Sequence, residues 1–210
     1  MLYDFRTYTL KPNAVPAVEK LFEDSMPTRE KYSRLGGFFH TEFGTLNQIL
    51  HIWPYEDLRD MDAIRKATRT DESGEWPPKG FTDYTVSMES EHMQSAPFMQ
   101  DWTGPQKLGK VYELRRYTLM PGKGPEVLKR WGAKIEGRIA LSPLAGCWIS
   151  AGTGGQQNVL LHLWPYESLE HRSQVRAESI AKGVWPPNSA EFYQRMENKV
   201  LVPASFSPLS

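Results

Sequence analysis

The sequence lacks most of the features that mark secreted, metal-binding or membrane proteins. Its single cysteine, Cys147, cannot form an internal disulfide, and there is no cysteine cluster for zinc. Because no histidine or basic residue adjoins it, Cys147 is expected to be a small core residue. No apolar run approaches the ~20 residues that a membrane helix needs, and the first ten residues do not resemble a signal peptide. These absences predict a cytoplasmic protein without a membrane span.

An excess of charge of either sign is also missing. Lys and Arg total 25, Asp and Glu total 25, and the charged runs are short and mixed. No basic field exists to attract nucleic acid or an anionic membrane, so neither is an expected partner. Aromatic residues make up 12% of the chain, which is typical of a packed core and not of a disordered segment.

The familiar cofactor and catalytic motifs are absent as well. There is no G-x-G-x-x-G after a strand, no Walker loop, no H-E-x-x-H and no G-x-S-x-G. The glycine-rich run at 152–155 is followed by no helix, so it is interpreted as a hairpin turn and not as a phosphate cradle. The sequence therefore predicts no cofactor and no metal site.

What the sequence does contain is a repeat of about 109 residues. YDFRTYTLKPN at 3–13 matches YELRRYTLMPG at 112–122, and HIWPYEDL at 51–58 matches HLWPYESL at 162–169. LGGFF matches LAGCW between these two segments, and a WPP triplet follows them in each copy, so all the matches occur in the same order. Such order indicates two copies of one unit, at 1–108 and 109–210.

Each unit is predicted to fold as β-α-β-β-α-β. Alternating, turn-bounded stretches predict strands at 3–10, 38–43, 48–53 and 81–88 in the first copy, with Pro54 ending the third strand. Apolar residues at helical spacing predict a helix from Val15 to Met26, with Pro27 kinking or interrupting it, and a second at 55–66. This is the ferredoxin-like arrangement, a four-stranded antiparallel sheet with helices on one face. Because each sheet has a bare face that needs covering, the two sheets are expected to cover each other. We therefore predict an α+β protein whose two tandem units form one α/β barrel within the chain.

Strand alternation offers candidate site residues. Plain aliphatic residues such as Leu50 and Ile52 suit packing against helices, which directs their neighbours into the barrel. The expected interior set is an Arg-x-Tyr beside a His-x-Trp in each half, namely Arg6, Tyr8, His51, Trp53, Arg115, Tyr117, His162 and Trp164. Aromatic walls with a few polar groups are typical of small-ligand sites. The alternative is structural, with the polar groups satisfied by carboxylates such as Asp4, Glu42 or Glu113 and the aromatics filling volume.

The two copies are not identical at the second strand. His40 and Glu42 of the first copy align with Ile149 and Ala151 of the second. If both polar residues face the lumen, the first half has the richer site and the second is degenerate. The alternative places His40 at an edge or on the surface.

These motifs resemble the NIPSNAP family. YELRRYTLMPGKGPEVLKRW, HLWPYESLEHRSQVRAESI and VPASFSPL carry the resemblance in the second half, and YDFRTYTLKPN with HIWPYEDL carry it in the first. The resemblance covers nearly the entire chain as a tandem two-repeat form and implies the dimeric α/β-barrel superfamily. Other members of that superfamily include cofactor-independent monooxygenases and isomerases, and their activities extend to this chain only by analogy of fold.

Two functions follow as expectations. In the first, the barrel lumen binds or transforms a small aromatic or anionic metabolite. In the second, the protein is a non-catalytic interaction scaffold. Closure of the barrel within one chain leaves other surfaces for a homo-oligomer.

Overall fold

The computed structural model describes all residues from 1 to 210. In the first half the elements are β1 (Leu2–Leu10), α1 (Val15–Arg29), β2 (Gly37–Phe43), β3 (Gln48–Tyr55), α2 (Leu58–Arg69) and β4 (Thr85–Ser95). The second half repeats this order with β5 (Val111–Leu119), α3 (Gly124–Ile139), β6 (Gly146–Ser150), β7 (Val159–Tyr166), α4 (Leu169–Ala181) and β8 (Tyr193–Pro203). A short 3-10 turn precedes β4 and another precedes β8.

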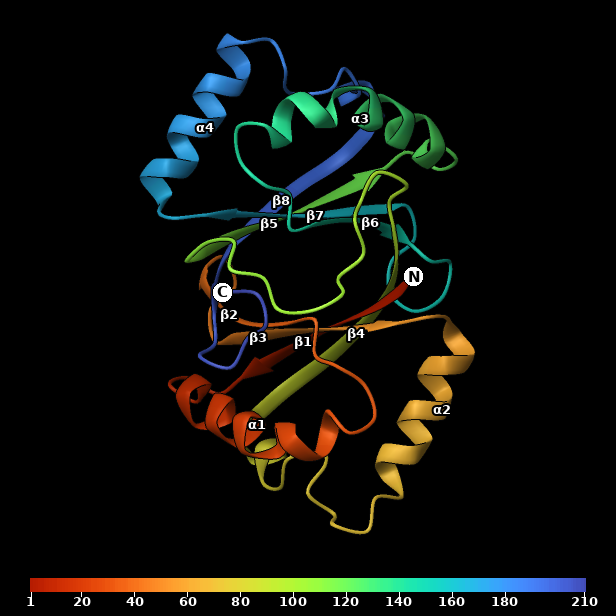
Figure 1. Cartoon of the computed structure of the whole chain (residues 1–210), viewed down its shortest axis with the longest axis vertical. Coiled ribbons are helices and arrows are strands. Elements are labelled where there is room, and N and C mark those ends of the chain that lie inside the picture. The colour runs from red at the N-terminus through yellow and green to blue at the C-terminus, as the bar shows by residue number, and fades with distance from the viewer.

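Eight antiparallel strands close into one barrel. Their order is β1-β3-β2-β8-β5-β7-β6-β4, so the halves join through β2 with β8 and β4 with β6. The helices of each half lie on the outer face of that half's strands, as Figure 1 shows. The predicted α+β barrel of two ferredoxin-like units is confirmed.

Several predicted boundaries were wrong. α1 continues through Pro27 to Arg29, so the helix tolerates the loss of the one backbone hydrogen bond that a proline cannot donate. β3 continues through Pro54 to Tyr55. β4 begins four residues after the predicted start at residue 81 and runs seven beyond the predicted end at 88, because 81–84 form a 3-10 turn.

The repeated Tyr-Glu-x-Leu segment starts a helix in each half. Asp57 caps α2 by accepting hydrogen bonds from the backbone N–H groups of Arg59 and Asp60, and Ser168 caps α4 by accepting from His171. A short side chain that accepts bonds from the first free N–H groups is what a helix start requires.

The space between the two sheets is a packed core and not an open lumen. It holds apolar side chains from both halves, including Phe5, Leu50 and Ile52 with Leu161 and Leu163. The segment that links β4 to β5 runs between the sheets in Figure 1, and its Trp102 donates from the indole N–H to the carbonyl of Ala145. One end of the barrel is thereby sealed.

Candidate functional site

The predicted site residues lie on the opposite face of the sheet from the one expected. Tyr8, His51 and Trp53 pack against α1 and its Phe22, outside the barrel. Leu50 and Ile52, assigned above to the helix side, face the interior. All eight residues of β3 are buried, because helices cover one face and the second sheet covers the other. With both faces apolar, residue type no longer distinguishes them.

The second half repeats this reversal. Tyr117 and Trp164 pack with Trp131 of α3, and Leu161 and Leu163 face the interior. The pairing between strands was nevertheless as expected, since Arg6 lies opposite His51 and Arg115 lies opposite His162. The Arg-x-Tyr and His-x-Trp sets therefore meet, but between sheet and helices.

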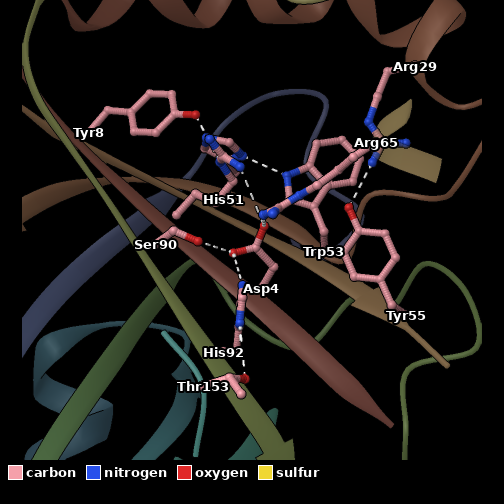
Figure 2. Close-up of polar contacts among 11 residues, drawn as sticks. Asp4, Tyr8, Arg29, His51, Trp53, Tyr55, Arg65, Ser90, His92 and Thr153 are labelled. Atoms are coloured by element: carbon pink, nitrogen blue, oxygen red, sulfur yellow. Dashed lines mark hydrogen bonds and ion pairs between the residues drawn. The ribbon is translucent and has the colours of Figure 1, made fainter. Parts of the chain in front are cut away.

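A buried histidine forms the floor of each helix-side site. The indole Nε1 of Trp53 donates a hydrogen bond of 2.7 Å to Nδ1 of His51, and Trp164 donates likewise to His162 at 2.6 Å. An indole N–H only donates, so Nδ1 accepts and the neutral ring carries its proton on Nε2. Figure 2 shows His51 between Tyr8 and Trp53.

This Nε2–H donor has no partner in either half. His51 and His162 are each 1% exposed, and the Nε2 atom of each is buried without a hydrogen bond. Burial, together with nearby arginines, holds the pKa of both histidines well below the ordinary value of 6.5. Each site thus contains a neutral, buried and unpaired hydrogen-bond donor, which costs free energy unless an acceptor reaches it.

A buried carboxylate fixes the arginines beside the first histidine. Asp4 is fully buried and accepts from Arg65 at 2.6 Å and from the hydroxyl of Ser90 at 2.6 Å, and its nearest oxygen is 3.6 Å from Nη1 of Arg6. Arg6 in turn donates from Nε to the hydroxyl of Tyr8 at 2.9 Å. The alternative in which carboxylates satisfy the arginines is therefore realised in part by Asp4.

Glu113 has the same function in the second half. It pairs with Arg115 at 3.0 Å and also accepts from Arg172 and Asn198. These contacts lower the pKa of the Glu113 carboxyl despite the opposing effect of its burial.

One arginine was missed by sequence reasoning in each half. Arg29 at the end of α1 is 3% exposed, donates to the hydroxyl of Tyr55 at 3.0 Å, and lies 4.2 Å from the ring centre of Trp53. Arg138 makes the same contacts with Tyr166 and Trp164. Recurrence of this arginine at the repeat spacing of 109 was the available signal.

These groups line a cavity in each half. The first has a volume of about 260 Å³ and the second about 180 Å³. The lining of the first includes Arg6, Arg29, Arg65, Arg69, Tyr8, His51, Trp53 and Trp76. That of the second includes Arg115, Arg138, Arg176, Tyr117, His162, Trp164, Trp185 and Ile180. Trp131 stands in the second half where the first has Phe22, and the larger ring takes up space beside the cavity.

His40 and Glu42 do not belong to this site. His40 faces α1, where Nδ1 lies 2.7 Å from the carboxylate of Glu19, and this hydrogen bond raises the pKa of the histidine. Glu42 is exposed. Neither faces the barrel interior, because alternation along β2 places Phe39 and Thr41 there instead.

No helix combines the length and apolarity that membrane crossing requires. No group of three or more His, Cys, Asp or Glu side chains is placed to hold a metal ion. The chemistry available in the cavities is therefore that of cationic, aromatic and hydrogen-bonding side chains.

Solved structures match this chain over different extents. A NIPSNAP domain protein from Burkholderia xenovorans, described as uncharacterised, is 30% identical and covers 48% of this chain and 100% of its own, with a TM-score of 0.45. A candidate monooxygenase from Lactobacillus acidophilus is 11% identical and covers 97% of this chain and 94% of its own, with a TM-score of 0.67. At that identity the second similarity shows the fold alone.

Sequence comparison gives the family. Human Protein NipSnap homolog 3B is 30% identical over 219 residues, which cover 99% of this chain and 85% of the relative. The Protein NipSnap homolog of Dictyostelium discoideum is 26% identical over 211 residues, covering 96% and 87%. The NIPSNAP family model matches residues 3–100 and 112–208. Because these two matches span nearly all of the sequence, the chain belongs to the NIPSNAP family.

Proposed function

We propose that the two helix-side cavities bind small molecules that carry an aromatic body and an anionic group. The observation that carries the proposal is the unpaired, buried Nε2–H of His51, a residue that lines a cavity together with four arginines and one carboxylate, Asp4. A buried donor without a partner is rare in folded proteins and favours a ligand oxygen at this position. Binding of such molecules in the centre of the barrel is not proposed, because apolar side chains from both sheets fill it.

The charges of the first cavity favour an anion. Arg6 and Arg65 share Asp4, and Arg29 is bonded to neutral Tyr55, whereas Arg69 has no side-chain partner. Arginine remains protonated in proteins, so this lining carries net positive charge. Carboxylate and phenolate groups match the planar guanidinium donors.

The walls favour a flat apolar body. Tyr8, Phe22, Trp53, Trp76 and Phe81 line the first cavity. Aromatic rings gain from stacked or edge-to-face contact with one another beyond the area that they bury. A ring with one carboxylate or phenolate would therefore direct its charged end to the arginines and its face to these walls.

Calorimetry with 2-naphthoate and its neutral analogue 2-naphthylmethanol tests the proposal. Naphthoate is expected to bind more tightly than the alcohol, and less tightly at high salt, since exposed charges are screened. Arg69→Gln should weaken naphthoate binding about fivefold, the value of one exposed charge pair. Arg59→Gln, on the same helix but outside this cavity, is the matched control and should change nothing. Equal affinity for acid and alcohol, or no binding of either, would contradict the proposal and leave the scaffold function.

A further inference from the structure

A cavity larger than either helix-side cavity lies at the end of the barrel that Trp102 does not seal. Its volume is about 700 Å³, and its apolar floor consists of Phe5, Leu50, Leu114 and Leu161. Around this floor stands a polar rim drawn from both halves, with Thr7, Gln48, Glu89, Glu91, Arg116, Glu197 and Lys199. We call this the barrel mouth.

The rim residues point into the barrel. Residues directly opposite each other on antiparallel strands share a face of the sheet. Lys199 lies opposite Leu114, and Glu89 lies opposite Thr7, which itself lies opposite Leu50. Since Leu50 and Leu114 pack in the interior, Lys199 and Glu89 face the interior too.

Most charges of the barrel mouth are already paired. Arg116 forms two hydrogen bonds of 2.7 Å with the carboxylate of Glu91. Glu197 accepts from Arg195 at 2.8 Å. What remains is one cation, Lys199, which lies in no ion pair, and one carboxylate, Glu89, which has no ion pair and no side-chain hydrogen bond.

Lys199 is held in place without a counter-ion. Its ammonium donates to the side-chain carbonyl of Gln48 at 2.6 Å, and the amide of Gln48 donates in turn to Thr9 at 2.9 Å. The stem of the lysine crosses Gly44, where an added Cβ would lie only 3.0 Å from Cγ of Lys199. Partial burial lowers the pKa of Lys199. Among the nearby charges that oppose this effect, the carboxylate of Glu89 acts most strongly. The ammonium is thus only partly compensated by the protein.

From this arrangement we infer that the barrel mouth is a second ligand site, which takes a small zwitterion with an apolar side chain, of the α-amino-acid type. A ligand carboxylate would pair with Lys199, a ligand ammonium with Glu89, and the side chain would cover the apolar floor. An anion without an amine fits less well, because it would enter a rim that holds three carboxylates against two cations.

Three probes of one shape separate these contributions. L-leucine carries both charges, 4-methylpentanoate lacks the ammonium, and 3-methylbutylamine lacks the carboxylate. The affinities are measured by calorimetry on the full chain, with 2-naphthoate present to saturate the helix-side cavities where it binds. Leucine is expected to bind at least about tenfold more tightly than either analogue. The leucine result does not depend on whether naphthoate binds.

Two variants assign the charges to their residues. Glu89→Gln should abolish the preference for leucine over 4-methylpentanoate and leave the preference over the amine. Lys199→Gln should abolish the preference for leucine over 3-methylbutylamine and leave the preference over 4-methylpentanoate. Lys110→Gln, which changes an exposed lysine outside the barrel mouth, is the control and should leave both preferences intact. The inference would be overturned if the unmodified protein bound leucine and 4-methylpentanoate equally, or if it did not bind leucine at millimolar concentration. It would also be overturned if either variant lost both preferences while circular dichroism showed an unchanged fold.

Discussion

At the scale of single residues, the sequence indicated which side chains meet but not where they point. The repeat marked Arg6, Tyr8, His51 and Trp53 with their counterparts, and the strands do bring these together. The assumption that aliphatic residues face helices was wrong, because the barrel interior is equally apolar. Arg29 was missed because its role depends on how α1 crosses Trp53, although its recurrence as Arg138 at the repeat spacing offered a signal.

The two buried histidines predict a dependence of stability on pH. Burial first, and neighbouring arginines second, lower the pKa of His51 and His162 in the folded state well below 6.5. The unfolded chain therefore binds protons that the folded chain refuses, and stability falls as the pH drops below about 6.5. Each histidine should contribute a slope that averages about 1 kcal/mol per pH unit between pH 5.5 and 6.5 and approaches about 1.4 kcal/mol per unit at lower pH.

Urea unfolding between pH 5.5 and 6.5 measures this slope. The variant His51→Gln removes one of these two groups, so the loss of unfolding free energy across this range should be smaller by about 1 kcal/mol than in the unmodified protein. His40, whose raised pKa gives the opposite dependence on pH, is present in both proteins and does not affect this difference. His171→Gln changes a half-buried histidine of α4, whose Nδ1 accepts from the backbone N–H of Glu167, and is the matched control. An unchanged slope in His51→Gln would show that His51 is protonated in the folded state.

At the scale of elements, the repeated motif is chiefly a device for joining a strand to a helix. Its last residues end β3 and β7, and Asp57 and Ser168 then cap α2 and α4. Periodicity predicted which elements exist and their order. It missed the ends of β3 and β4, because prolines at strand ends and a 3-10 turn leave no periodic signal.

The caps allow a quantitative test. Asp57→Ala leaves the backbone N–H groups of Arg59 and Asp60 without their acceptor, and should lower the unfolding free energy by about 1 kcal/mol. Ser168→Ala should cost a similar amount in α4. Chemical denaturation monitored by circular dichroism gives both values. Asp57→Asn, which retains an accepting oxygen, is the control, and a loss as large as that of alanine would refute capping as the cause.

At the scale of the whole molecule, the barrel exists only when both halves are present. Two of its strand pairs join the halves, and one core cluster contains residues of both. The closed barrel followed from the sequence because a sheet with a bare apolar face needs a second sheet to cover it. The division of the chain at residues 108 and 109 stays a prediction.

Cutting the chain between Gly104 and Lys110 tests this dependence. The two separate halves, expressed together, are expected to associate one to one, because each exposes the interior face of its sheet when alone. Light scattering after size-exclusion chromatography measures the mass of the product. Halves that remain folded and monomeric at micromolar concentration would contradict the dependence.

The helix-side cavities are lined by residues of different halves, and the helices of the two halves lie on opposite sides of the barrel (Figure 1). In a barrel assembled from two identical chains, every substitution is imposed on both sites at once. Here each site is encoded separately, so one can change while the other is preserved. Arg69 in the first cavity already corresponds to Ile180 in the second. Duplication within one chain therefore allows the linings of the two cavities to be inherited and modified independently.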